Sequence, residues 1–456
     1  MMQKLLIISR TVIIISIFAL LIMAAVSYFL KHGNPFKSNS ALKCTFKKEK
    51  ANGIIFGKKG PVYYFSPAAA EGHIFVGGGS GTGKTSALLI PTLQSWNGTS
   101  FVVDISGDIS ANVEIHRKLI YAPMAASSAP YNIFGPIDDL PDGTDRIEAL
   151  AQLAWLIMPE LVNSSANANY YQNGGRAILT AALIWGYHAG LDFINICEAI
   201  TDNSYTSLFN LIDQSKDAAA IRYINQFEGN APQNTAGCKQ NTDRAVELFS
   251  TNDRVKRSIH RPAPDETALC CSSVEDHAVF VLIPDARLEL LGPLLHIITA
   301  QLLNYLADRP AENKTPILLA LDEFVSLGKL EIGSALRKLR KKRVRIMILT
   351  QSMADIDELY TRDTRMSMLN NFAYKVILSA GDTDTQRYYA DLIGQEEKTK
   401  TSITSGSIFS GHSSTETRST ERGYIIEPAA LANLRNDLVL LYPGGYRRLQ
   451  KNFYFK

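Results

Sequence analysis

Short apolar runs recur along the chain and predict the strands of a buried sheet. They lie at 74–76, 101–104, 278–284, 316–324, 344–350, 374–379 and 437–442, and an alternating run follows at 447–455. Runs that are apolar at nearly every position are typical of strands covered on both faces, which occur in parallel α/β sheets. The pattern therefore predicts an α/β fold.

Between the second and third of these runs the apolar spacing becomes helical. From about residue 141 apolar side chains recur every three or four positions, for example at Leu150, Ala154 and Ile157, which places them on one face of a helix. We therefore expect residues 141–269 to form an all-α domain inserted into a nucleotide-binding domain made of residues 51–140 and 270–456. Two polar stretches, 163–173 and 229–244, predict loops within the insertion.

Residues 11–30 form an apolar stretch without a charged residue, and about 20 such residues can cross a bilayer as a helix. A cleaved signal peptide is the alternative, but its apolar region would be shorter and would end in a small-x-small site. We favour a retained membrane anchor within residues 1–30. Lysines in the following basic linker, 31–50, outnumber the basic residues before the stretch, which predicts a single-pass protein with a cytoplasmic C-terminal body.

The composition excludes few classes of protein. Hydrophobic residues make up 46% and charged residues 20% of the 456 positions, as in ordinary folded proteins. The net charge of +3 does not indicate nucleic-acid binding, so any such argument must rest on local clusters. The five cysteines include no C-x-x-C pair, which favours reduced thiols over a zinc site. In 401–420, 14 of 20 residues are Ser, Thr or Gly, which predicts a mobile loop.

A glycine-rich motif of the form G-x-x-x-x-G-K-T follows the apolar run at 74–76 and precedes a helix-forming segment that contains Pro91. This strand–loop–helix order is what a phosphate-binding loop requires. The glycines let backbone N–H groups turn toward a polyphosphate, and the helix N-terminus adds its positive dipole end. We expect Lys84 to bind the β- and γ-phosphates of ATP and the Thr85 hydroxyl to bind Mg²⁺. The predicted nucleotide-binding residues are Gly78, Gly79, Ser80, Gly81, Thr82, Gly83, Lys84, Thr85 and Ser86.

Polar residues at the ends of three other strands predict the rest of an NTPase site. The run at 316–324 contains Asp322 and Glu323, which we expect to hold Mg²⁺ and to deprotonate the attacking water, respectively. Gln351 follows the neighbouring run and would lie within reach of a γ-phosphate. Asp104 ends another run, and two interpretations are open for it: a water-mediated contact with Mg²⁺, or the cap of a turn.

Seven of the nine residues at 337–345 are basic. Three interpretations are open: a solvated surface, a contact with DNA phosphates, or an arginine that enters the site of a neighbouring subunit. The position next to the catalytic strands favours the third for Arg340, with Arg343 and Arg345 as weaker candidates.

Several motifs together resemble the type IV secretion coupling proteins, the TraG/TraD-like group. The resemblance is carried by Leu318-Leu-Ala-Leu-Asp-Glu-Phe-Val-Ser-Leu-Gly-Lys-Leu330, by Thr350-Gln-Ser-Met-Ala-Asp-Ile-Asp-Glu-Leu-Tyr360 and by Ser379-Ala-Gly-Asp-Thr-Asp-Thr385. It implies a RecA-like P-loop NTPase domain with an all-α insertion, and nucleotide roles for Lys84, Thr85, Asp322, Glu323 and Gln351. The family usually has a second membrane helix, which this sequence does not show.

The same resemblance implies a function. Members are homo-hexameric ATPases of the bacterial inner membrane that couple ATP hydrolysis to delivery of relaxase-bound single-stranded DNA, or of proteins, into a secretion channel. Other secretion ATPases and inner-membrane channel components are the implied partners. A membrane-anchored DNA translocase of the FtsK/HerA type without a secretion channel is the alternative, and a non-hydrolysing nucleotide-binding scaffold is a third possibility.

Overall fold

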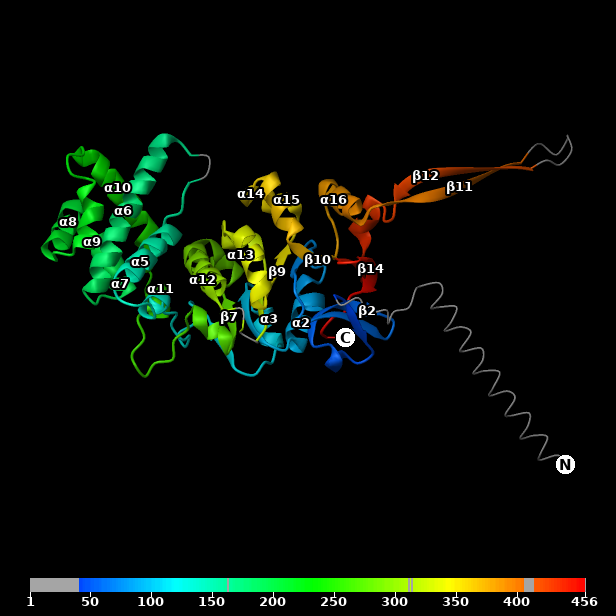
Figure 1. Cartoon of the computed structure of the whole chain (residues 1–456), viewed down its shortest axis with the longest axis horizontal. Coiled ribbons are helices and arrows are strands. Elements are labelled where there is room, and N and C mark those ends of the chain that lie inside the picture. The colour runs from blue at the N-terminus through cyan, green and yellow to red at the C-terminus, as the bar shows by residue number, and fades with distance from the viewer. Residues whose placement is uncertain (1–40, 162–163, 311, 313–314, 406–413, 456) are drawn as a thin grey trace, which may run out of the picture.

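The computed structural model describes residues 41–161, 164–310, 312, 315–405 and 414–455. A helical lobe occupies one end of this part of the chain, a sheet covered by helices forms the centre, and a long β-hairpin projects at the far end (Figure 1). The predicted membrane helix at 11–30 and the first half of the basic linker, 31–40, lie outside the described residues.

One mixed sheet forms the centre of the molecule. Its twelve described strands follow the order β1-β3-β2-β14-β13-β10-β4-β9-β8-β5-β7-β6, in which the seven from β10 to β6 are parallel. The other five form an antiparallel extension next to β10. The bounds are β1 Lys43–Thr45, β2 Gly53–Lys59, β3 Val62–Pro67, β4 His73–Gly77, β5 Thr99–Asp104, β6 Lys118–Tyr121, β7 Ala278–Leu282, β8 Ile317–Leu321, β9 Val344–Thr350, β10 Phe372–Ile377, β13 Asp437–Tyr442 and β14 Gly445–Gln450.

The inner parallel strands are mainly apolar because both faces of the sheet are covered. Within β4, Ile74 and Val76 belong to one core cluster, whereas Phe75 belongs to the other. Since successive side chains of a strand point to opposite faces, this alternation separates the core into two layers. All five residues of β8 are buried.

Helices cover both faces of the sheet and connect its strands. The longest of them, α12, packs against the insertion as well as the nucleotide-binding domain. Their bounds are η1 Lys48–Lys50, η2 Lys84–Leu89, α2 Ile90–Ser95, α3 Asp108–Asn112, α4 Gly135–Asp138, η3 Cys271–Glu275, η4 Asp285–Arg287, α12 Leu288–Asp308, η5 Phe324–Leu327, α13 Ile332–Leu339, η6 Arg340–Lys342, α14 Met353–Leu359, α15 Arg362–Asn370, α16 Thr383–Ile393 and η7 Pro428–Asn433.

The lobe contains only helices among its described residues. These are α5 Thr144–Ile157, α6 Ala166–His188, α7 Phe193–Asp202, α8 Tyr205–Gln214, α9 Ala218–Asn225, α10 Pro232–Thr251 and α11 Asp253–Ile259. The loops predicted at 163–173 and 229–244 were wrong in extent, because α6 begins at Ala166 and α10 at Pro232. Ser165 caps α6 by accepting a hydrogen bond from the Ala168 N–H, and a proline at the first helical position suits α10.

The two connections to the lobe run side by side and form a neck. Leu269 N–H donates to Pro130 O (2.8 Å), and Asn132 N–H donates to Leu269 O (2.7 Å). Tyr131 also donates its hydroxyl to the buried Gln301 of α12 (2.9 Å). The two chain connections to the lobe are therefore hydrogen-bonded to each other, and α5 of the lobe also packs against α12.

The Ser/Thr/Gly-rich segment differs from the prediction. Where a mobile loop was expected at 401–420, the structure has two paired strands, β11 Gln395–Ser405 and β12 Ser414–Tyr424, joined by residues that are not described. The hairpin projects away from the body in Figure 1. Threonine favours strands, and this ribbon pairs with itself rather than with the core, so it lacks the apolar alternation that would have revealed it.

Two other predictions concern where elements end. Pro91 was expected to kink or end the helix after the phosphate loop. In the structure a π-helical turn, η2, ends at Leu89 and α2 begins with Ile90 and Pro91, where a missing N–H is tolerated. The strand predicted at 447–455 ends at Gln450, because the following residues leave the sheet and pack against η2.

Among the described residues one stretch, Asp285–Asp308, is long and apolar enough to cross a membrane. About half of it (56%) is buried inside the protein, so its apolar character is that of a core helix. It therefore adds no evidence for a membrane span.

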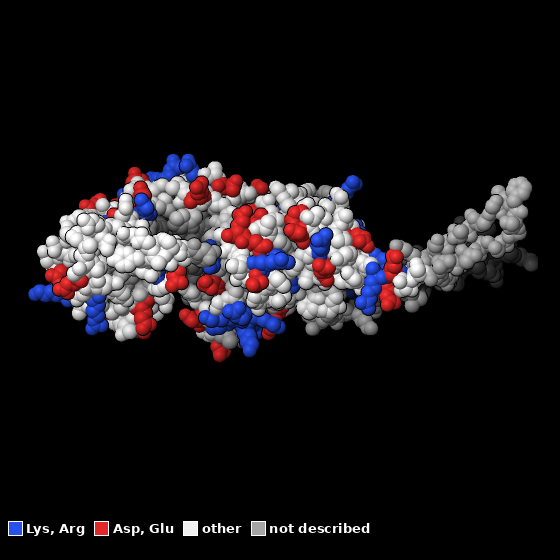
Figure 2. Space-filling view, turned by 90° about the horizontal axis from the view of Figure 1, so that it is seen from above, with Lys and Arg blue, Asp and Glu red and all other residues white. Residues whose placement is uncertain are grey.

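The surface carries no large region of one charge in the view of Figure 2, where acidic and basic side chains are interspersed apart from one dense basic cluster near the middle. A groove of about 1140 Å³ lies between α5, α12 and the η5–α13 segment. Its lining is mainly apolar and does not include Lys84 or Asp322, so it is separate from the phosphate loop.

Candidate nucleotide-binding site

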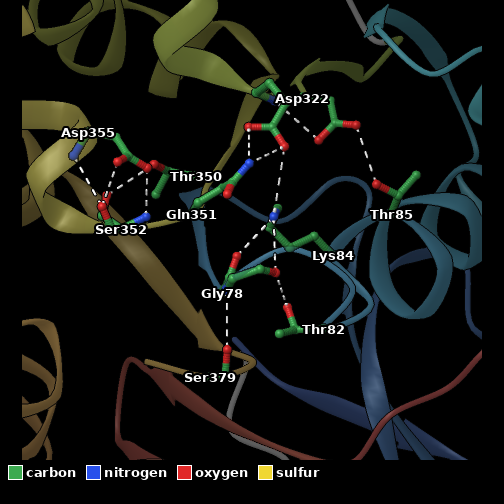
Figure 3. A network of polar contacts seen from close by, with 12 residues as sticks. Gly78, Thr82, Lys84, Thr85, Asp322, Thr350, Gln351, Ser352, Asp355 and Ser379 are labelled. Carbon is green, nitrogen blue, oxygen red and sulfur yellow. Dashed lines mark hydrogen bonds and ion pairs between the residues drawn. The ribbon is translucent and has the colours of Figure 1, made fainter. Parts of the chain in front are cut away.

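Four neighbouring parallel strands place the predicted site residues at one edge of the sheet. In the order β10-β4-β9-β8, their carboxyl ends lead into Ser379, the phosphate loop, Gln351 and Asp322, respectively. The carboxyl ends of parallel strands are where α/β sheets bind ligands. The two halves of the predicted site, which are far apart in sequence, therefore meet (Figure 3).

The phosphate loop has a conformation that depends on glycine. Gly81 and Gly83 have φ values of 71° and 97°, which residues with a Cβ adopt only under strain. A Cβ on Gly78 would lie 2.7 Å from Thr82 Oγ1 and 2.9 Å from Leu378 Cβ. The loop is anchored to the sheet by a hydrogen bond from Gly78 N–H to Thr350 O (3.1 Å).

Lys84 is buried beneath this loop, with only 7% of its surface exposed. Its ammonium donates to Gly78 O (2.9 Å) and Gly79 O (3.4 Å), and it lies 3.9 Å from Glu323 Oε1. The closest contacts of this buried ammonium are to neutral carbonyl groups, and the nearest carboxylate, Glu323, lies at the edge of ion-pair distance. This position suits the binding of a phosphate.

Thr85 and Asp322 are joined directly: the threonine hydroxyl donates to Asp322 Oδ2 (3.3 Å). Burial raises the pKa of Asp322 to about 6, and the Glu323 carboxylate acts in the same direction, while Lys84 and the hydrogen bonds from Glu323 N–H and Thr85 oppose the rise. A buried carboxylate of this kind is stabilised in its charged form by a bound cation.

Glu323 begins the turn after β8 with φ 47° and ψ 53°, a left-handed conformation that is uncommon for a residue other than glycine. The Gln351 amide donates to both of its carboxylate oxygens (3.2 and 3.3 Å). Ser352, the residue after Gln351, caps α14 through reciprocal hydrogen bonds with Asp355. The Glu323–Gln351 contact therefore joins the turn after β8 to the capped start of α14.

Ser379 belongs to the site, but the sequence analysis did not predict a role for it. Its hydroxyl accepts a hydrogen bond from Gly79 N–H (3.2 Å), and so fixes part of the phosphate loop. Ser379 follows β10, which pairs with the strand of the phosphate loop. The rule that selected Gln351, a polar residue after the carboxyl end of a neighbouring strand, would have found it.

Asp104 was open to two interpretations, and its contacts favour the turn cap. Its two carboxylate oxygens accept from Gly107 N–H (2.9 Å) and Ser110 N–H (2.7 Å). The residue is fully buried, and both oxygens serve the turn before α3.

The basic run does not reach the site of its own chain. Arg340 precedes the amino end of β9, at the sheet edge opposite the phosphate loop, and pairs with Glu71 (3.2 Å) while 63% exposed. Arg345 cannot be an arginine finger because it is buried and donates to Gly72 O, Ser66 Oγ and Pro67 O. Arg343 adopts a left-handed conformation between η6 and β9.

The donor set fits a magnesium-bound nucleotide. No cluster of three or more His, Cys, Asp and Glu side chains suited to a metal occurs in the described part of the chain. Mg²⁺ in nucleotide sites needs none, since one or two protein oxygens, phosphates and water complete its shell. Thr85 and Asp322 supply such oxygens, and the glycine-lined loop supplies the phosphate cradle.

Comparison of the sequence with known protein families identifies the family to which the chain belongs. The family model described as "Type IV secretory system Conjugative DNA transfer" matches residues 29–456. Protein VirD4 of Rhizobium rhizogenes is 23% identical over 76% of the chain, and the conjugal transfer protein TraG of Agrobacterium fabrum is 23% identical over 85%. The matches span only 53% and 61% of these relatives' own lengths.

Solved structures of the bacterial conjugative coupling protein TrwB share the fold. The unbound form superposes with a TM-score of 0.67 at 18% identity, covering 83% of this chain and 84% of that one. A complex of TrwB with ADP and Mg²⁺ has a TM-score of 0.64 at 18% identity and covers 84% and 85%. The expected RecA-like P-loop α/β fold is thereby confirmed.

Proposed function

The chain belongs to the type IV secretory system conjugative DNA transfer family, and from this premise we propose that it is a coupling ATPase. It recruits relaxase-bound single-stranded DNA or protein substrates and uses ATP hydrolysis to deliver them into a secretion channel. Family membership favours this function over the FtsK/HerA-type translocase.

One observation carries the proposal: residues 237 positions apart in sequence, Thr85 and Asp322, are in hydrogen-bond contact. Lys84, Glu323 and Gln351 surround the same point through the contacts described above. Phosphate, metal and water ligands of an NTPase must converge in this way. A scaffold that only binds nucleotide would not need Glu323 held by Gln351.

Each residue then has a distinct role. ATP with Mg²⁺ supplies the phosphoanhydride bond that is split. The loop 78–86 binds the phosphates, Lys84 compensates their charge, and Thr85 and Asp322 hold the metal. Glu323 accepts the proton of the attacking water, and Gln351 orients Glu323 and that water. The TrwB complexes with an ATP analogue and with ADP and Mg²⁺ support these cofactors.

The surrounding assembly follows from the same proposal. The chain is anchored in the bacterial inner membrane through residues 11–30, with its body in the cytoplasm, and assembles as a homo-hexamer. Arg340 acts on the nucleotide of the adjacent subunit, because it lies at the wrong edge of the sheet to reach its own. Other secretion ATPases and inner-membrane channel components are the partners.

The test is Lys84→Ala. We expect ATPase activity and conjugative transfer to be lost, because the buried ammonium no longer compensates the phosphate charge, while membrane insertion is unchanged. Lys43→Ala, which removes an exposed lysine of β1, is the control and should retain both activities. Full transfer by Lys84→Ala would contradict the proposal.

A further inference from the structure

The residues after β14 lie against the phosphate loop. Tyr454 N–H donates to Ser86 O (3.0 Å), in the first turn after the loop. The Phe453 ring covers Gly83, since a Cβ added there would lie 3.2 Å from Phe453 Cε1. Lys451 fixes the start of this segment through Lys451 N–H to Asn436 O (2.7 Å) and its ammonium to Arg435 O (2.6 Å).

This segment presents aromatic rings to solvent next to the loop. Phe455 is 61% exposed, the largest exposed fraction among the exposed large hydrophobic residues of the described chain, and Phe453 is half-buried. The two rings lie 5.3 Å apart at 34°, and Tyr454 lies 5.1 Å from Phe455. Tyr454 packs on a core cluster, so it anchors the segment that carries the half-buried Phe453 and the exposed Phe455.

The phosphate loop limits where the base of a bound nucleotide can lie. The glycine loop, Lys84 and Thr85 take the phosphates, so the ribose and base extend past the loop toward the residues that border it. Gly83 and Ser86 are the loop residues that the aromatic segment contacts. Aromatic side chains stack on the faces of bases, which provides binding independent of base-edge hydrogen bonds.

We propose that Phe453 and Phe455 form the platform on which the purine base of the nucleotide stacks. This inference rests on the proposed function, because it concerns the same nucleotide site. Stacking depends on ring area rather than on edge groups. The platform therefore favours ATP and GTP over CTP and UTP and discriminates little between the two purines.

The test compares a nucleotide with a probe that has no base. Binding of Mg²⁺-ADP and of Mg²⁺-tripolyphosphate to the purified full chain in detergent is measured by calorimetry for Phe455→Ala and Phe453→Leu. We expect each variant to weaken ADP binding on the order of tenfold and to leave tripolyphosphate binding unchanged. Phe455→Trp should bind ADP like the parent chain, unlike Phe455→Ala, because tryptophan keeps an aromatic face at this position.

The control is Tyr170→Ala, which removes an exposed aromatic ring from α6 in the lobe, at one end of the molecule and away from the C mark in Figure 1. It should bind both probes like the parent chain. Equal losses for ADP and tripolyphosphate would show that the phenylalanines only support the loop, and no loss for either would show that the base lies elsewhere; both outcomes overturn the inference. If the parent chain binds neither probe, the proposed function itself fails.

Discussion

Among single residues, Glu323 shows most directly how backbone and chemistry are linked. Its left-handed conformation costs about 1–3 kcal/mol, a strain that must be compensated by the surrounding fold. The turn brings its carboxylate within 3.9 Å of Lys84 and within hydrogen-bond distance of Gln351. Strained residues of this kind are concentrated at functional sites.

Glu323→Gln tests this assignment. Glutamine keeps the size of the side chain and one acceptor oxygen for Gln351 but cannot accept a proton from water. We expect hydrolysis to fall by about 10²–10⁴-fold while Mg²⁺-ATP binding stays within a few-fold. Steady-state ATPase assays and calorimetry measure the two quantities. Hydrolysis within tenfold of the parent chain would exclude Glu323 as the base.

His73, at the start of the phosphate-loop strand, has a fixed protonation state. Ile346 N–H donates to Nδ1 (3.0 Å), and Nε2 lies 2.8 Å from Leu336 O. Nδ1 must therefore be unprotonated and Nε2 must carry the hydrogen. Burial lowers the pKa of His73 to about 4, and the positive charge of Arg345 acts in the same direction.

Stability should therefore depend on pH. In the unfolded chain His73 has its ordinary pKa of 6.5. As the pH falls from 6.5 to about 4, the imidazole is therefore protonated in the unfolded chain but stays neutral in the folded chain. This group's contribution to the free energy of unfolding is full above pH 6.5 and falls by about 2 kcal/mol at pH 5. NMR of the labelled imidazole should show a neutral ring at pH 5. A ring that titrates near pH 6.5 would contradict this expectation.

Among the elements, β9 connects the site to the antiparallel extension. Gln351 follows the carboxyl end of β9, and Arg345 lies near its amino end. The Arg345 guanidinium donates hydrogen bonds to Ser66 and Pro67 of β3 and lies 5.2 Å from the centre of the Tyr374 ring. Tyr374 donates its hydroxyl to Ala41 O (2.7 Å), at the start of the described chain. The strand therefore links the nucleotide site to the start of the described chain, which follows the proposed membrane anchor.

Arg345→Met should weaken this connection. The substitution leaves the carbonyl groups of Gly72 and Pro67 without their buried donor, and each such loss costs about 1–3 kcal/mol. We expect the free energy of unfolding to fall by about 3 kcal/mol, as measured by urea denaturation. Arg337→Met, at an exposed position of α13, should change it by less than about 0.5 kcal/mol. Unchanged or higher stability for Arg345→Met would show that burying the guanidinium costs as much as its contacts return.

The sequence predicted the elements whose apolar pattern is local and missed those defined by distant contacts. Buried strands such as β8 and the helical spacing of α5 are visible in short windows. The pairing of β11 with β12 involves polar residues, and the burial of Arg345 depends on β3, so neither is visible locally. The phosphate loop and Asp322 were predicted because their chemistry requires particular residues at a strand end. Ser379 also follows a strand end, but its contact with Gly79 depends on the pairing of β10 with β4, which is not visible locally.

For the assembled protein, the position of Arg340 has the largest consequence. The seven residues of β9 separate it from the edge that holds Gln351, a distance of about 20 Å. Its proposed action on a nucleotide therefore requires a second copy of the chain. Neither copy alone would then have a complete site.

Mixing two inactive variants tests this dependence. Arg340→Ala should lower ATPase activity about 10³-fold or more, as the loss of an arginine finger does. Adding Glu323→Gln subunits should partly restore it, because hybrid interfaces combine Glu323 from one variant with Arg340 from the other. Activity measured across mixing ratios should pass through a maximum. A flat response would place Arg340 outside the subunit interface.

The neck between Tyr131 and Leu269 implies that the lobe is exchangeable. Because both ends of the lobe leave the sheet hydrogen-bonded to each other, the distance that a replacement must bridge is short and fixed. A foreign helical domain grafted between these two residues would leave every strand of the central sheet in register. The inserted helical domain can therefore differ between proteins that share the same nucleotide-binding domain.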